Sequence, residues 1–242
     1  MKQRSIERYL ARSLTVAALG ASILVSAPAV ANAQSHGGTP EATWSCATAG
    51  TPTAAGHEDM AMGDDMQMDI AEVEFDQLYI DMMLPHHGSI IALSQAALPE
   101  LTGPRLQEMA QNIIDAQAAE NAQLTEWRTD WYGSGDPAMD EMTMELMLEA
   151  MPVGTMEEMM REMDAAYQVT TFCAADNPDL AFIDQVIPHH QMAIDASEVA
   201  VEQAVHPELV ALAEEVIVAQ QAEIDLLVDI RAELAGEATP AA

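Results

Sequence analysis

Basic residues are scarce in this sequence, and their scarcity excludes several classes of partner. The 242 residues include 8 Lys and Arg against 40 Asp and Glu, which gives a formal net charge of −32. Beyond residue 33 the only basic side chains are those of Arg105, Arg128, Arg161 and Arg231. A surface this acidic repels nucleic acid and anionic membranes and attracts cations of every kind. The acidic charge thus excludes some partners but does not identify one, because a requirement for solubility in salt would also favour an acidic surface.

Catalytic motifs are absent as well. The sequence has no His-Glu-x-x-His, no Gly-rich phosphate loop and no Gly-x-Ser-x-Gly. It also lacks the Glu-x-x-His motifs of the dinuclear carboxylate oxidases that are built on helical bundles. Cys46 and Cys173 are the only cysteines, and they lack the CxxC spacing of a redox motif. We therefore identify no catalytic residue.

The first 33 residues contain the longest apolar run, and this run is too short for a membrane span. It extends from Leu14 to Val25, follows a basic segment and is succeeded by Ala31-Asn32-Ala33. This order is typical of a secretory signal peptide cleaved after residue 33, and the alternative is an uncleaved anchor. We expect an exported protein, periplasmic or extracellular, without a membrane attachment after cleavage. In that compartment the two cysteines form a disulfide, or else serve as metal-binding thiols.

Strand-like, period-2 patterns are also missing, and the composition divides the remainder of the chain into three parts. Residues 34–68 are rich in Gly, Ala, Thr, Pro and acids and show no helical period, which indicates a disordered tail. Residues 69–236 are poor in Gly and Pro and have helical periodicity throughout. Residues 237–242 form a short C-terminal tail. The sequence therefore predicts an all-α protein.

An internal repeat predicts how these helices are arranged. Residues 76–127 align without a gap to residues 179–230, at a constant offset of 103. Each copy is long enough for two helices, with the turns marked by residues 99–104 and 206–207. Two such hairpins can bury their apolar faces against each other. We expect a ferritin-like four-helix bundle, in which repeat one spans about 70–131, a Met-rich helical crossover about 133–175, and repeat two about 176–235.

The second helix of each predicted hairpin places polar side chains in its apolar stripe. Gln117 and Glu120 interrupt the first stripe, and Gln220 and Glu223 interrupt the second at the same positions. A carboxylate at a core position costs several kcal/mol unless it is paired. The groups opposite these side chains are therefore expected to be polar, basic or metallic. Alternatively, the stripe rotates and the four side chains reach solvent.

The first helix of each hairpin supplies adjacent histidines as partners. His86 and His87 follow Pro85, and His189 and His190 follow Pro188. Neutral imidazole is a good ligand for copper, zinc, nickel and iron. We predict that the four imidazoles converge on metal. The remaining ring N–H groups would then be held by the side chains of Gln117, Glu120, Gln220 and Glu223. A structural imidazole–carboxylate network is the alternative. Each proline either kinks a helix just before the histidines or marks a helix start.

The residues around the two histidine pairs resemble a known family. Asp81-Met82-Met83-Leu84-Pro85-His86-His87 and residues 182–194 are similar to the signature of the bacterial family known as domain of unknown function 305. The resemblance implies a ferritin-like bundle, export and a role in copper binding, sequestration or resistance. Two positions depart from the family pattern: Gly88-Ser89-Ile90 replaces Gln-Met-Ala, and Val186 replaces a methionine. Each departure removes a possible thioether near a histidine pair, so the two halves need not bind metal equally.

Methionine is abundant, with 18 residues in the chain. Thioether sulfur favours Cu(I) or Ag(I), but methionine is also an adaptable core residue. For the cluster from Met139 to Met163 both interpretations stay open. Three methionines near the histidines, Met82, Met83 and Met192, are candidate ligands, and Asp81 and Asp184 are candidate partners of the ligands. A second candidate site lies in the tail, where the donors are His57, Met60, Met62, Met66 and Met68.

Together these patterns predict an exported metal-binding protein, with copper as Cu(I) or Cu(II) the expected ion and another transition metal possible. Two alternatives remain open. A copper centre with an open coordination position would make the protein a metal-dependent oxidase of unfamiliar type. A buried histidine network without metal would make it a structural protein whose stability responds to pH. The sequence does not indicate an oligomeric state or a protein partner.

Overall fold

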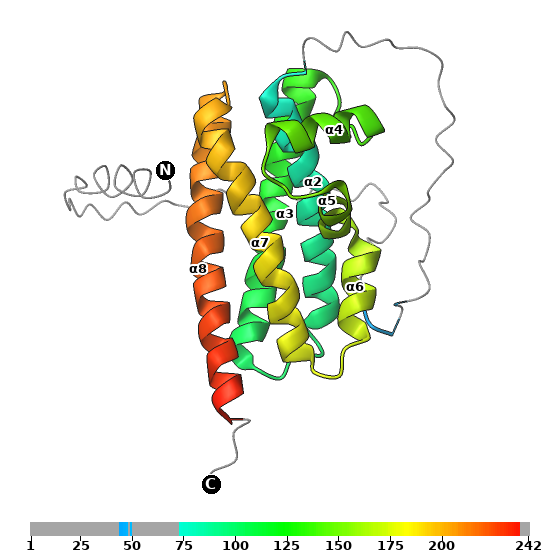
Figure 1. The fold of residues 1–242 in the computed structure, drawn as a ribbon, viewed down its shortest axis with the longest axis vertical. Coiled ribbons are helices and arrows are strands. Elements are labelled where there is room, and N and C mark those ends of the chain that lie inside the picture. The colour runs from blue at the N-terminus through cyan, green and yellow to red at the C-terminus, as the bar shows by residue number, and fades with distance from the viewer. Residues whose placement is uncertain (1–43, 48, 50–72, 238–242) are drawn as a thin grey trace, which may run out of the picture. The chain divides into compact units, whose positions relative to one another are not determined.

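The computed structural model describes residues 44–47, 49 and 73–237, and these residues contain seven α-helices and no strand (Figure 1). The all-α prediction is therefore confirmed. The helices are α2 (Phe75–Ala97), α3 (Pro104–Tyr132), α4 (Glu141–Ala150), α5 (Met156–Met163), α6 (Ala165–Cys173), α7 (Pro178–Gln203) and α8 (Pro207–Glu237). Within the described part of the chain, no helix is both long and apolar enough to cross a membrane.

The four long helices form two hairpins that pack through their first helices. The helix α2 pairs with α3, α7 pairs with α8, and α2 packs against α7 (Figure 1). Proline begins the second helix of each hairpin, at Pro104 and Pro207, where a missing N–H costs nothing. The helix α3 ends before Gly133, whose φ of +83° is a left-handed conformation that suits glycine.

Each hairpin closes the turn of the other. The Asp76 carboxylate, at the start of α2, accepts hydrogen bonds from the backbone N–H groups of Val205 and His206 at 3.0 and 2.9 Å. Asp179, at the same position of α7, accepts the backbone N–H of Thr102 at 2.8 Å. Both carboxylates are buried and use their charge to satisfy turn donors. The exchange fixes the register of one hairpin against the other.

Pro85 and Pro188 lie inside α2 and α7. The interpretation of each proline as a helix start is therefore wrong. A proline within a helix leaves the carbonyl four residues earlier without its usual N–H partner and bends the helix. In both helices this interruption comes directly before the histidine pair.

The segment between the hairpins forms the three short helices α4, α5 and α6, and all three pack on α2. Of the three, α6 also packs on α7. Four of the methionines in this segment fill the core against α2, namely Met147, Met151, Met159 and Met163. Met142 and Met160 are exposed instead. The cover explains why α2 is buried on nearly all sides, whereas α7 keeps an exposed face.

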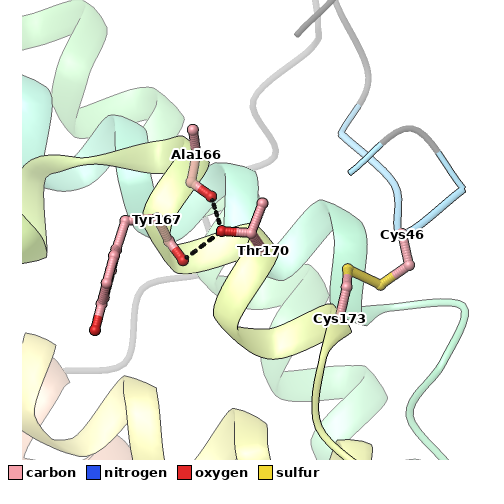
Figure 2. Close-up of a disulfide and its surroundings, with 5 residues drawn as sticks. All are labelled: Cys46, Ala166, Tyr167, Thr170 and Cys173. Atoms are coloured by element: carbon pink, nitrogen blue, oxygen red, sulfur yellow. Dashed lines mark hydrogen bonds between the residues drawn. A yellow bond between two sulfur atoms is a disulfide. The ribbon is translucent and has the colours of Figure 1, made fainter. Parts of the chain in front are cut away.

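A disulfide joins Cys46 to Cys173 at the end of α6 (Figure 2). Trp44, close to the first cysteine, packs with Ala92, Ala96 and Val169. The cysteines therefore tether the segment around residue 46 to the covering helices, and the interpretation as metal-binding thiols is wrong in this oxidised state. The end of α6 is further held by Thr170, whose hydroxyl donates to the Ala166 carbonyl at 2.7 Å (Figure 2).

Candidate metal centre

The two histidine pairs lie at the middle of the contact between α2 and α7. His86, His87, His189 and His190 each have 0% of their surface exposed. Four fully buried imidazoles are unusual because each ring carries two polar nitrogens that need a partner. Their hydrogen bonds therefore decide what the centre can do.

The inner two rings come from equivalent positions of the two repeats and contact each other at a tilt. The centroids of His86 and His189 are 3.6 Å apart, with 31° between the ring planes. His87 lies 6.2 Å from His86, and His190 lies 6.2 Å from His189. The repeat thus brings residues 103 positions apart in the sequence into direct contact.

The outer two rings are held by carboxylates from the second helix of each hairpin. Nε2 of His87 lies 2.7 Å from a carboxylate oxygen of Glu120, and Nε2 of His190 lies 2.7 Å from one of Glu223. A carboxylate accepts, so the nitrogen that faces it, Nε2, carries a proton, and in the neutral form of each ring Nδ1 carries the lone pair. Both Nδ1 atoms are buried and have no hydrogen-bond partner among the described residues.

The His189 ring is oriented by backbone and by a serine. Its Nε2 lies 3.0 Å from the carbonyl oxygen of His86 and 3.0 Å from the hydroxyl of Ser89. Because a carbonyl only accepts, this Nε2 also carries the proton. The Ser89 hydroxyl further contacts the backbone carbonyl of Glu162, which belongs to the covering helix α5. The Nδ1 of His189 is left with a lone pair and, within the part of the chain that the structure describes, no partner.

Neither ring nitrogen of His86 has a hydrogen bond to residues 44–47, 49 or 73–237. Burial lowers the pKa of His86 well below its usual range, and the neighbouring His87 and His190 lower it further. Burial also lowers the pKa of His189, with His86 adding to the effect. Both rings are therefore neutral at ordinary pH, and neutral imidazole is the form that binds metal.

Other residues predicted near the histidines have different partners. The Asp81 carboxylate forms a buried ion pair with Arg128, and Asp184 forms an exposed pair with Arg231. Both aspartates thus bind arginine in the structure, and their predicted role beside the imidazoles stays a prediction. The sequence does not predict the ion pair between Asp81 and Arg128, because the two residues are 47 positions apart and no local pattern connects them.

The remaining predicted residues divide into those within the core and those that the structure does not describe. Gln117 and Gln220 are each 3% exposed, and neither side-chain oxygen has a partner among the described residues. Met82 and Met83 are buried, and Met192 is partly buried. The predicted tail site lies outside the described residues; it comprises His57, Met60, Met62, Met66 and Met68.

Five buried nitrogens without partners in the described part of the chain make this centre suitable for a metal ion. They are Nδ1 and Nε2 of His86 and the Nδ1 atoms of His87, His189 and His190. Among residues 44–47, 49 and 73–237, however, no three His, Cys, Asp or Glu side chains are grouped as a metal site requires. Binding would therefore need a rotation of one or more rings. The donor set, neutral nitrogen with nearby thioether, fits copper and other borderline or soft ions.

Sequence reasoning did not find the contribution of the covering helices. Ser89 is noticeable in the sequence only as a departure from the family pattern, yet it joins His189 to α5. The backbone carbonyl of Glu162 has no sequence signal at all. Met109, which lines a surface pocket together with Glu223, lies in the same apolar stripe as Gln117 and Glu120, and nothing in the sequence marks it as a donor.

The family resemblance is confirmed by comparison with known families. The sequence model described as Domain of unknown function (DUF305) matches residues 26–128 and residues 76–231. The second match alone spans more than half of the 242 residues. The chain belongs to the DUF305 family.

Solved structures of similar fold include copper-bound proteins. CopM in the Cu(I)-bound form is 29% identical, with a TM-score of 0.50 over 66% of this chain and 96% of that one. CopM in the Cu(II)-bound form is 28% identical, with a TM-score of 0.51 over 66% and 97%. A Streptomyces coelicolor DUF305 protein, 18% identical, has a TM-score of 0.52 over 66% and 93%, and it supports the fold alone. None of the curated proteins matches the chain.

Proposed function

We propose that this DUF305 protein is exported and binds copper through His86, His87, His189 and His190, in a sequestration or resistance role. The observation that carries the proposal is the set of buried imidazole nitrogens that have a lone pair and no partner among the described residues. Leaving such groups unpaired costs about 1–3 kcal/mol each, so a ligand that satisfies them gains affinity. Glu120 and Glu223 support it by fixing the proton on Nε2 of the outer rings.

The chemistry of the donors favours Cu(I), and Cu(II) or another transition metal is the next candidate. Neutral imidazoles surrounded by apolar groups stabilise a monovalent ion at a lower desolvation cost than a divalent one. The thioethers of Met82, Met83 and Met192 would add soft ligands close to the histidine pairs. CopM, which is similar in fold, has been solved with Cu(I), Cu(II) and Ag bound. This similarity supports the proposal that the present protein binds metal.

The architecture that we propose for this function is a ferritin-like four-helix bundle made of two repeated hairpins. The core contacts between α2 and α7 and the mutual capping by Asp76 and Asp179 support it. Within such a bundle, donors from both hairpins project to the centre. One ion bound there would link the two halves of the chain.

A structural role without metal is the second candidate, and the same hydrogen bonds favour it. His87 and His190 already have a carboxylate partner each, and His189 has the His86 carbonyl. A network of this kind can specify how two hairpins pack without any ion. In that case the free Nδ1 atoms would be a tolerated cost of the packing.

Glutamine variants of the inner histidines separate the two candidates. Gln is similar in size to His and lacks the strong nitrogen donor, so the double variant His86→Gln/His189→Gln removes ligands with little loss of volume. His206→Gln is the matched control, because His206 is partly exposed and bonded to Asp76 in the turn before α8. Equilibrium dialysis against Cu(I) should show at least a tenfold loss of affinity, about 1.4 kcal/mol, for the double variant only. Equal affinity of all three proteins would contradict the proposal.

The tail donors are a second part of the proposal. Replacing His57, Met60, Met62, Met66 and Met68 by alanine should lower the number of Cu(I) ions bound while the tightest affinity stays unchanged. These substitutions are preferable to deleting residues 34–68, since the deletion would also remove Cys46 and its disulfide. If the tightest site is lost on substitution, the main site lies in the tail.

A further inference from the structure

A surface pocket between α3 and α8 reaches one of the carboxylates that hold the histidines. The pocket has a volume of about 330 Å³ and is lined by Arg105, Glu108, Met109, Asn112, Glu223 and Leu226. Glu223 lies in this pocket and at the same time bonds Nε2 of the buried His190. It therefore connects the surface to the histidine centre.

We propose that this pocket is the access site through which a soft monovalent cation reaches the histidines, with Met109 and Glu223 as its first ligands. The inference rests on the proposed function, since it concerns how the same centre is loaded. Met109 supplies a thioether that is only 4% exposed, and Glu223 supplies a carboxylate that is 25% exposed. A thioether beside a carboxylate retains a soft cation weakly, which suits transfer to stronger nitrogen donors.

The charges around the pocket also favour a cation. Glu108 and Glu223 contribute two negative charges to its lining. Arg105 is the one basic residue among the described residues of the lining, and its guanidinium lies 2.9 Å from both carboxylate oxygens of Glu233. The Glu233 carboxylate therefore offsets the positive charge of Arg105. The local field therefore attracts a cation and raises its rate of entry.

The repeat supplies a built-in comparison, because the equivalent positions differ in the other half. Leu212 is the counterpart of Met109, and Glu120 is the counterpart of Glu223, each at the offset of 103. The exposed fractions of Met109 and Leu212 are similar, at 4% and 6%. Met109 therefore gives this pocket a soft donor, whereas Leu212 gives none at the equivalent position of the other half. Entry should therefore be faster on the His190 side than on the His87 side.

A second hollow in the described part of the chain is less suitable for entry. It has a volume of about 260 Å³ and is lined by Met192, Pro188, Arg161 and Glu162, among others. The Glu162 carboxylate is already bound by Arg161 at 3.3 Å and by Gln168 at 2.9 Å. Burial also raises the pKa of Glu162, which weakens its attraction for a cation. Met192 is then the donor that a soft ion would meet first on that side.

Stopped-flow transfer of Cu(I) from a coloured chelator to the metal-free full-length protein tests the access site. Met109→Leu should lower the second-order rate constant about three- to tenfold while the equilibrium affinity stays within about twofold, because Leu keeps the volume and removes the sulfur. Leu212→Met, the matched change on the other side, should leave the rate unchanged or raise it. Glu223→Gln should slow transfer more than Glu120→Gln does, although both replace a carboxylate beside a histidine by a neutral amide.

The outcomes separate this proposal from the function on which it rests. Normal affinity with equal rates for Met109→Leu and the unmodified protein overturns the access site and leaves copper binding intact. Slow transfer for Met192→Leu but not for Met109→Leu overturns it as well, and places entry beside α5. Absence of any Cu(I) uptake by the unmodified protein overturns both proposals. Circular dichroism of each variant excludes a loss of folding as the cause of slow transfer.

Discussion

The imidazoles of His86 and His189 are in contact, with a centroid separation of 3.6 Å, and neither ring has a carboxylate as hydrogen-bond partner among the described residues. Both rings have pKa values well below the usual range of histidine, chiefly because burial penalises the charged form. Two positive rings at this distance would also repel each other. The contact between α2 and α7 therefore requires neutral histidines, and this requirement makes the fold sensitive to acid.

Stability of the metal-free protein should fall as the pH is lowered through about 6.5. Unfolded histidine binds a proton near pH 6.5, whereas the folded rings of His86 and His189 bind it only at lower pH. Well above that pH both states are neutral and nothing changes; below it the unfolded state gains protons. The free energy of unfolding should then decrease by up to about 1.4 kcal/mol per pH unit for each ring.

Urea unfolding at about pH 7.5, 6.5 and 5.5 measures this dependence on both sides of the histidine pKa. The range avoids most carboxylate titration, and the His86→Gln/His189→Gln variant supplies the baseline. A steeper loss of stability in the unmodified protein than in that variant is the expected result. Identical slopes would mean that the two rings are protonated equally in the folded and unfolded states.

The two equivalent Asp–Arg pairs should differ greatly in their effect on stability. Asp81 and Arg128 are 0% and 5% exposed, whereas Asp184 and Arg231 are 52% and 48% exposed. Asp81→Asn leaves the Arg128 charge buried without its partner, which costs about 3–5 kcal/mol. Asp184→Asn should cost about 0–1 kcal/mol, because water screens the pair. Denaturant unfolding of both variants checks the contrast, and equal losses would disprove the difference in environment.

The hydroxyl of Tyr79 should stabilise one half of the core only. It lies 2.8 Å from the hydroxyl of Ser197, whereas the equivalent residues are Phe182 and Ser94, whose hydroxyl has no partner among the described residues. Tyr79→Phe should therefore cost about 1–3 kcal/mol, because it leaves Ser197 unpaired in the core. Adding Ser197→Ala should recover much of this loss. Thermal or chemical unfolding of the single and double variants measures both values, and additive losses would argue against the bond.

Removing the disulfide should lower stability without changing the histidine centre. Cys46 and Cys173 are 127 residues apart, so their bond restricts a long loop of the unfolded chain. The variant Cys46→Ser/Cys173→Ser should lose about 2–4 kcal/mol of unfolding free energy. Its tightest copper affinity should equal that of the oxidised protein. A large loss of affinity would show that the histidine centre depends on the disulfide, which holds the segment around residue 46 to α6.

The sequence predicts the parts of the fold that repeat. The constant offset of 103 between residues 76–127 and 179–230 is sufficient to place the hairpins, the histidine pairs and the Gln–Glu pairs. The spacing also explains why Glu120 and Glu223 lie beside the outer rings in the same way. Local periodicity is sufficient here because the two copies must bury the same face.

What the sequence does not predict depends on contacts between the copies and on the covering segment. The mutual capping by Asp76 and Asp179 joins turns of opposite hairpins and leaves no local pattern. The helices α4 and α5 cover α2 far more than α7, so the two copies of the repeat have unequal surroundings. The contact between the rings of His86 and His189 follows from how the hairpins pack, which a periodicity cannot specify.

The most direct test is titration of the purified protein with Cu(I), Cu(II) and Zn(II) in separate experiments, each against a competing chelator that sets the affinity scale. We expect tight binding with Cu(I) preferred over Zn(II), and loss of the tightest site in His86→Gln/His189→Gln but not in His206→Gln. Uptake no stronger than that of an acidic surface, unchanged by the histidine variants, would contradict it and leave the four imidazoles as a structural network.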